Sequence, residues 1–149
     1  AGTNCRPIFF TGQQCEVQGF YDDFTPVPDV PIATVATTWS DPLTGKGYIL
    51  IMHKVLYFGN KMDHSLINPN QLRHYGVVVH DNRYETDPTR TMGIEIDDNN
   101  LIPFSLQGST VFFNTRYPDD NELDTYPHVV ITCDKPSIDC IANCSIKFL

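Results

Sequence analysis

The residue types that most often carry chemistry occur in this chain, but not at the spacing of a known catalytic or metal site. Two acidic runs, DDNNL (97–101) and PDDNELD (118–124), lack the glycine at position six and the glutamate at position twelve of a calcium loop. The run LTGKG (43–47) lacks the spacing of a phosphate-binding loop. Neither G-x-S-x-G nor H-E-x-x-H occurs. We therefore assign no catalytic residue, no metal ligand and no cofactor from these motifs.

The histidines and cysteines form no recognisable ligand set either. The five histidines are scattered, and the five cysteines include no C-x-x-C pair. Because five is odd, at least one thiol is unpaired within a monomer; buried thiols and one or two disulfides both remain open. A tight hairpin about Gly12-Gln13 places Cys5 opposite Phe20, too far from Cys15 for a bridge. We favour this hairpin with free thiols if the protein is intracellular.

Length and charge exclude several classes of protein. A chain of 149 residues is about one domain, and it is long enough to bury a core without a metal or disulfide. A formal net charge of −8 argues against nucleic acid and against an anionic membrane surface as partners. No apolar run approaches the ~18 residues of a spanning helix, and we see no signal peptide in the first ten residues.

The chain is predicted to be all-β, barrel-like or sandwich-like, with one short helix. We expect one β-rich domain over 1–133 and make no structural prediction for the tail, 134–149. The two most strongly predicted strands, 32–39 and 47–58, are joined by SDPLTGKG, which predicts a long hairpin. The other predicted strands are 6–10, 15–20, 77–80, a hairpin over 93–106, 109–117 and 128–133, with a capped turn or short helix over 118–126.

The helix is predicted over 68–75. Asn68 is a good N-cap, and Pro69 suits the first helical position. Gly76 suits the left-handed position that ends a helix. Leu72 and Tyr75 are three residues apart, so they share one face, and we expect Leu72 to be buried.

Aromatic residues suggest surfaces rather than chemistry. Trp39 ends a predicted strand, where it either packs or closes over a ligand, and packing is the more common role. Phe9-Phe10 and Phe112-Phe113 are adjacent pairs within predicted strands, so the two rings of each pair point to opposite faces. That arrangement predicts burial on both faces or a surface for another chain, and it favours self-association.

One stretch resembles a known family. DVPIATVATTW…GKGYILIMHKVLYFGNKMDHSLINPNQLRHYGV is similar to the protease region of copia-type retrotransposon polyproteins, which is a retropepsin-like aspartic protease. The family signature Leu-(Leu/Ile)-x-x-x-Gln-Leu corresponds to 66–72 here. The likeness covers roughly 4–133 and is specific in 50–80. It implies a turn at Gly59 that precedes the helix, and a flap-like hairpin over about 37–48 with Trp39 and Gly45 or Gly47 near its tip.

The resemblance stops at catalysis. Such proteases carry Asp-(Thr/Ser)-x-Ala, whose aspartates from two subunits share a proton, and no such motif occurs in these 149 residues. The start, AGTNC, resembles the segment directly after that motif, so the resemblance implies a catalytic aspartate upstream of Ala1. We therefore expect no peptidase activity from the chain as written.

Two hypotheses arise from these observations. The chain is either a non-catalytic, self-associating structural domain, or a fragment of an active retropepsin-like protease. In either case its expected partner is itself, as a closed dimer or a filament. The tripeptide Asn143-Cys144-Ser145 fits the N-glycosylation sequon, which matters only in a secreted protein. Localisation stays open: intracellular for a retrotransposon polyprotein, extracellular for a glycosylated assembly subunit.

Overall fold

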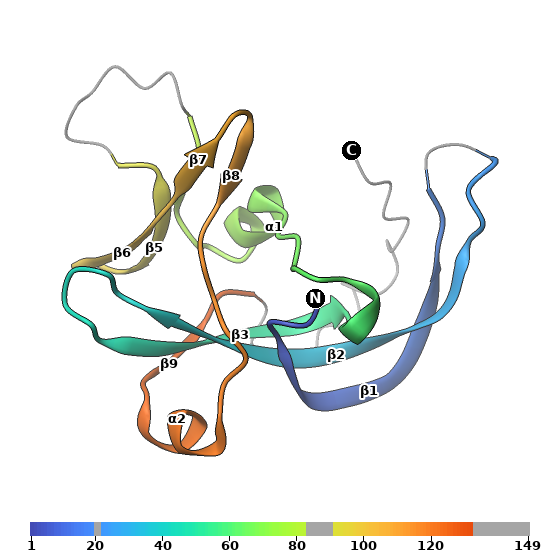
Figure 1. Ribbon diagram of the computed structural model, residues 1–149, viewed down its shortest axis with the longest axis horizontal. Helices are drawn as coiled ribbons and strands as arrows, with labels where there is room; N and C mark the ends of the chain where they lie inside the picture. Colours follow the sequence, from blue (N-terminus) through green and yellow to red (C-terminus); the bar gives the residue numbers. More distant parts are fainter. Residues whose placement is uncertain (20–21, 83–90, 133–149) are drawn as a thin grey trace.

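A computed structural model of the protein describes residues 1–19, 22–82 and 91–132. Strands dominate, so the predicted all-β class is confirmed (Figure 1). The strands are β1 (Arg6–Val17), β2 (Val27–Ser40), β3 (Gly47–Leu56), β4 (Val79–His80), β5 (Gly93–Asp97), β6 (Asn100–Pro103), β7 (Ser105–Gln107), β8 (Thr110–Phe112) and β9 (His128–Val130). The helices are η1 (Gly59–Lys61), α1 (Pro69–His74) and α2 (Asp120–Thr125).

The main sheet has four strands in the order β1-β2-β3-β9. β2 and β3 form the predicted antiparallel hairpin, in which Trp39 pairs with Tyr48 and Ser40 with Gly47. β9 adds parallel to β3. The second half of β2 is buried on both faces from Val35 to Trp39, which is why this run is apolar or threonine throughout.

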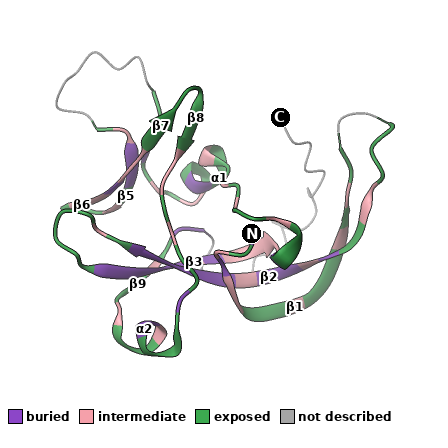
Figure 2. Cartoon of the chain, viewed as in Figure 1, coloured by how far each residue is buried: buried purple, intermediate pink, exposed green. Residues whose placement is uncertain are grey.

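The predicted hairpin between 6–10 and 15–20 is wrong. Residues Arg6–Val17 form one strand that pairs along β2, with a register shift between Phe10 and Gln14. Gly12 lies in this interval with a φ of 81°, so the glycine predicted to form a turn instead allows an irregularity within a continuous strand. The C-terminal end of β1 and the N-terminal end of β2 project together from the rest of the molecule as an arm (Figure 1). Most of the β1 surface in this arm is exposed (Figure 2).

The predicted helix is confirmed as α1. The Asn68 side chain accepts a hydrogen bond from Asn70 N at 3.0 Å, and Pro69 opens the helix. Leu72 is buried, with 1% of its surface exposed. Gly76 has a φ of 82°, and the chain closes the helix there through Val77 N, which donates to Leu72 O at 3.1 Å.

The C-terminal half adds two small sheets and a second helix. The predicted 93–106 hairpin is present as β5 and β6, which form a sheet with β4, and β7 pairs with β8. The predicted 109–117 strand is shorter, because β8 ends at Phe112. The run predicted to be a capped turn or short helix forms α2, with a capping box between Asp119 and Glu122.

A buried carboxylate fixes α2 against the main sheet. Glu122 is 7% exposed, and its Oε2 accepts a hydrogen bond from Thr38 Oγ1 at 3.1 Å. Its other oxygen pairs with Arg116, whose backbone bridges to Thr38 in both directions at 2.9 Å. Both oxygens of the buried acid are therefore satisfied, as a charge at this depth requires. None of the helices within 1–19, 22–82 and 91–132 is long and apolar enough to cross a membrane.

Candidate functional site

The first five residues lie between the end of β3 and the turn that carries η1 (Figure 1). The Ala1 amine donates to Leu56 O at 2.7 Å, and Phe58 N donates to Ala1 O at 2.9 Å. Thr3 N donates to Met62 O at 2.9 Å on the other side. The N-terminal segment is therefore held from both sides by chain that is more than 50 residues away in sequence.

Gly2 makes this arrangement possible. A Cβ at this position would lie 2.3 Å from Met62 O and 2.7 Å from His64 O, which are backbone atoms that cannot move aside cheaply. Gly2 N donates to Ser65 Oγ at 2.9 Å. Only glycine allows the two segments to approach this closely.

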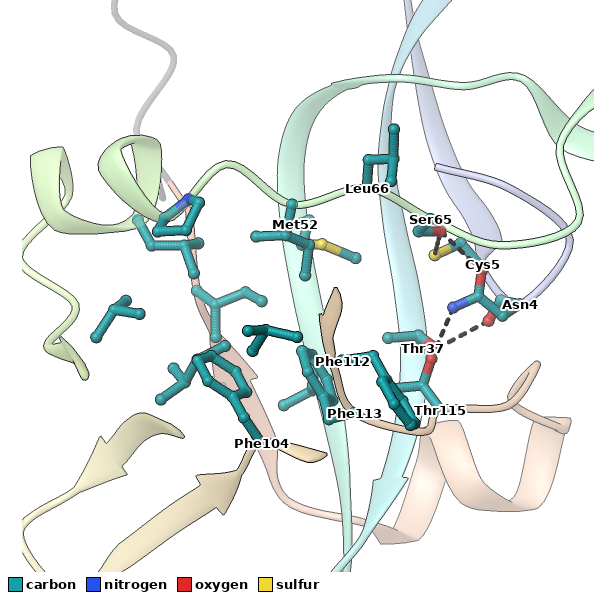
Figure 3. A pocket seen from close by; sticks show the side chains of 18 of the residues that line it. Asn4, Cys5, Thr37, Met52, Ser65, Leu66, Phe104, Phe112, Phe113 and Thr115 are labelled. Carbon is teal, nitrogen blue, oxygen red and sulfur yellow. Dashed lines mark hydrogen bonds between the residues drawn. The ribbon is translucent and has the colours of Figure 1, made fainter. Parts of the chain in front are cut away.

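Asn4 joins four separate parts of the chain (Figure 3). Its Oδ1 accepts a hydrogen bond from Ser65 Oγ at 2.7 Å, and its Nδ2 donates to Thr115 Oγ1 at 2.7 Å. Its backbone carbonyl accepts from Thr37 Oγ1 at 2.8 Å. We refer to Asn4, Thr37, Ser65 and Thr115 as the Asn4 network. These short polar side chains hold the N-terminal segment against β2, the turn before α1 and the chain after β8.

Burial perturbs the two titratable groups of this segment. Removal from water lowers the pKa of the Ala1 amine below its ordinary value of 8.0. Burial also raises the pKa of the Cys5 thiol, and the hydrogen bond with Ser65 only partly opposes this. Cys5 Sγ lies 3.2 Å from Ser65 Oγ. At neutral pH the thiol is therefore protonated and a poor nucleophile, so the pair is not an activated cysteine site.

A cavity of about 340 Å³ lies beside the Asn4 network (Figure 3). Its walls come from β3, α1, β5, the β7–β8 hairpin and the segments that flank them. Most of its lining is apolar, and the polar part of the lining includes the whole Asn4 network. The lining includes Asn4, Cys5, Thr37, Leu50, Met52, Ser65, Leu66, Leu72, Asp81, Phe104, Val111, Phe113 and Thr115.

The three residues predicted at the tip of a flap occupy packing and turn positions. Trp39 is 4% exposed, and its ring centroid lies 5.6 Å from that of Tyr48. Gly45 has a φ of 73° in the exposed turn, and a Cβ on Gly47 would lie 2.2 Å from the ring of Tyr126. None of the three lines the cavity. The 41–46 turn therefore leads into a strand that packs against the end of α2, and its residues do not cover the cavity.

The predicted turn and helix residues do meet the site. Gly59 opens η1 with a φ of 53°, directly after the part of the chain that holds Ala1. Pro69 and Leu72 line the cavity from α1, whereas Asn68 caps the start of that helix and Gly76 directly follows its C-cap, Tyr75.

The four phenylalanines proposed for self-association separate into two groups. Phe9 and Phe10 are 62% and 50% exposed on β1, which is an edge strand of the main sheet. Phe112 and Phe113 instead line the cavity, and Phe113 stacks on Phe104 with centroids 6.1 Å apart. Among the described residues, only the first pair lies on an edge strand of the main sheet and outside the cavity.

Two other sequence predictions can be placed only in part. Cys5 carries a free thiol, so it is not bridged to Cys15, which lies in β1 opposite Val30. Asn143 and the cysteines at 133, 140 and 144 lie outside the described residues. Within the described ranges, no group of three or more His, Cys, Asp or Glu side chains is arranged to hold a metal ion.

Sequence reasoning did not identify the Asn4 network. The start AGTNC contains Asn4, but Ser65 and Thr115 are 61 and 111 residues away from it.

Comparison with known proteins identified no relative of this chain. No protein-family model, no curated protein and no solved structure matches it.

Proposed function

We propose that this chain is the frame of one half of a retropepsin-like aspartic protease, and that it acts as a self-associating domain. Residues 1–149 supply the body, the N-terminal loop and the helix, but no catalytic carboxylate motif. In this proposal, residues 1–149 become half of a catalytic site when the motif Asp-(Thr/Ser)-x-Ala precedes Ala1.

The placement of the N-terminal loop is the observation that supports this proposal most. Residues 1–4 pass between Leu56–Phe58 and Met62–Ser65, fixed by backbone hydrogen bonds on both sides. The sequence resemblance makes this loop the continuation of a catalytic motif and makes 66–72 the signature that comes after it. Ser65 directly precedes this signature, and its hydroxyl hydrogen-bonds to the loop at Gly2 N and at Asn4 Oδ1. A rigid loop held by backbone bonds is the support that a catalytic group needs to keep its geometry.

Self-association is required by the chemistry of the proposed enzyme. Aspartic proteases use two carboxylates that share one proton, because like charges about 3 Å apart cannot both ionise. One chain of this kind provides one loop, so a complete site requires two chains. Among the described residues that line the cavity, Asp81 is the only carboxylate, and it pairs with Arg73 at 2.6 Å, so it is not a substitute.

A matched pair of extended chains tests this function. One carries an N-terminal extension that ends in the family motif, Asp-Ser-Gly-Ala, directly before Ala1, and the other carries the same extension with Asn in place of that Asp. An amide N–H at Ala1 can still donate to Leu56 O, so the loop keeps its hydrogen bond. We expect cleavage of a denatured protein at acid pH by the Asp form only, blocked by a transition-state analogue of aspartic proteases. A folded Asp form with no such activity contradicts the proposal.

The exposed edge of β1 favours a second candidate, a purely structural assembly domain. Ile8, Phe9 and Phe10 are 49%, 62% and 50% exposed on an edge strand. Edge strands offer unpaired backbone N–H and C=O groups to another chain. Exposure of the adjacent apolar side chains to water is unfavourable, and this also favours association. Head-to-tail pairing through this edge gives a filament, whereas two-fold pairing gives a dimer.

Sedimentation at micromolar concentration tests this second function. We expect the native chain to form species larger than a monomer, and Phe9→Ser to shift the distribution toward the monomer. Leu43→Ser, at a side chain that is 93% exposed in the 41–46 turn, is the control and should leave the distribution unchanged. A native chain that stays monomeric on concentration contradicts both candidates, whereas an assembling chain whose Asp-extended form is inactive leaves only the structural one.

A further inference from the structure

We propose that the cavity between β3, α1 and the β7–β8 hairpin binds a neutral, apolar small molecule. This site lies beside the N-terminal loop but is built mainly from other side chains, and the inference does not depend on the proposed protease ancestry. The volume, lining and charge of the cavity each limit the chemistry of its ligand.

Volume and lining point to an apolar occupant. The cavity measures about 340 Å³. That is within the range of small-molecule sites, roughly 300–1,000 Å³, and more than the ~150 Å³ that suffices for benzene in an apolar protein interior. Leu50 and Met52 line the cavity from β3, and Leu72 lines it from α1. The stacked pair Phe104–Phe113 also lines it, and Figure 3 shows these two rings and Met52.

The rim of the cavity is apolar as well. Leu66 and Val111 both line the cavity, and they are 64% and 39% exposed. Leu66 precedes α1, and Val111 lies in β8. Apolar side chains that reach from solvent into a cavity lose exposed surface when a ligand occupies it, which adds to the affinity for an apolar molecule.

The polar side chains of the lining need no hydrogen bond from the ligand. Ser65 and Thr115 bond to the Asn4 side chain, and Thr37 bonds to its backbone carbonyl. Within the described part of the chain, no buried side-chain nitrogen or oxygen lacks a hydrogen-bond partner. A ligand therefore needs no matching donors or acceptors, and a strongly polar one would lose its own hydration without compensation.

Charge disfavours anions. The lining drawn from the described residues contains no lysine, arginine or histidine, and its carboxylate, Asp81, pairs with Arg73 at 2.6 Å. The whole chain carries a net charge of −8. A carboxylate such as that of a fatty acid would meet no cation in this lining, so the corresponding alcohol should bind better than the acid.

Fluorescence titration with N-phenyl-1-naphthylamine, a neutral apolar dye, tests the site. We expect saturable binding by the native chain, with displacement by decan-1-ol and at least tenfold weaker displacement by decanoate at pH ~7.5. Leu66→Asp places a charge on the rim at an exposed position, and we expect it to weaken dye binding at least tenfold. Leu43→Asp is the matched control, because that leucine is 93% exposed and does not line the cavity.

A second rim variant keeps the test independent of folding. Val111→Asp approaches the cavity from a different element, and circular dichroism of all three variants identifies any that fails to fold. Three results would each overturn the inference: no saturable dye binding by the native chain, equal displacement by decanol and decanoate, or equal affinity in the folded rim variants and the Leu43→Asp control.

Discussion

Ser65 Oγ donates a hydrogen bond to Asn4 Oδ1 at 2.7 Å, which joins the N-terminal segment to the turn that leads into α1. The same hydroxyl oxygen accepts from Gly2 N at 2.9 Å. One small side chain therefore holds two points of a loop 61 and 63 residues away. In the resemblance to retrotransposon proteases, the N-terminal segment corresponds to the loop that follows the catalytic motif, and α1 corresponds to the helix that supports this loop. The Ser65 contact connects these two regions.

Replacing that hydroxyl should destabilise the protein. Ser65→Ala leaves Gly2 N and Asn4 Oδ1 without their partner in a partly buried place, which we expect to cost about 2 kcal/mol of unfolding free energy. Urea unfolding measures the change. Ser40→Ala, at the exposed end of β2, is the control and should stay within about 0.5 kcal/mol of the native chain. Equal midpoints for the two variants would show that the Ser65 contact contributes nothing.

Adding a single methyl group at Gly2 should have a larger effect. A Cβ there lies 2.3 Å from Met62 O, so Gly2→Ala forces the two backbone segments apart, at a cost of about 3 kcal/mol. Gly45→Ala has open space around the Cβ and a φ of 73°, so it meets only backbone strain, about 1 kcal/mol. Thermal unfolding of both variants compares the two costs. A Gly2 variant no less stable than the Gly45 variant contradicts this position for the loop.

The burial of α1 gives a third prediction. Leu72→Asp places an unpaired charge where 1% of the leucine is exposed, and we expect a loss of several kcal/mol or failure to fold. Leu72→Ala is the milder form, with an expected cost of about 3 kcal/mol. Leu43→Asp, at a 93% exposed site, is the control. A folded Leu72→Asp protein with the native melting temperature refutes this position for the helix.

The partly buried Ala1 amine gives a pH dependence. Burial lowers the pKa of the Ala1 amine in the folded state below its ordinary 8.0, so its contribution to stability is fully present above pH ~8. That contribution is lost as the pH falls through the folded-state pKa, because the folded protein must then bury a charge. N-terminal acetylation removes the titration. Urea unfolding measures the stability of the acetylated chain relative to the free chain. We expect this difference to grow as the pH falls from about 9 to about 6. A difference that does not change with pH contradicts this.

Local signals predicted the local elements well. The Asn68-Pro69 start and the Gly76 end of α1 depend on residues within one or two turns of each other, and the cap is present as expected. The 41–46 turn likewise depends on its own side chains, since Asp41 accepts hydrogen bonds from Leu43 N and Thr44 Oγ1.

Non-local arrangements were not predictable in the same way. TGQQ has the composition of a turn, but pairing of both of its flanks with β2 converts it into an irregularity within β1. The Asn4 network joins residues from four distant segments, and no sequence period or motif marks Ser65 or Thr115 as partners of Asn4. The two phenylalanine pairs look alike in sequence, yet one lies on a sheet edge and the other in a cavity wall.

The rate law of the Asp-extended chain tests the central claim most directly, because it depends on both the added aspartate and self-association. We expect inhibitor-sensitive peptidase activity that rises with the square of chain concentration below the dissociation constant of the dimer, and linearly above it, with no activity from the Asn-extended chain. A folded, self-associated Asp-extended chain without activity, or equal activity in the Asn form, would contradict the proposal that this chain is half of an aspartic protease.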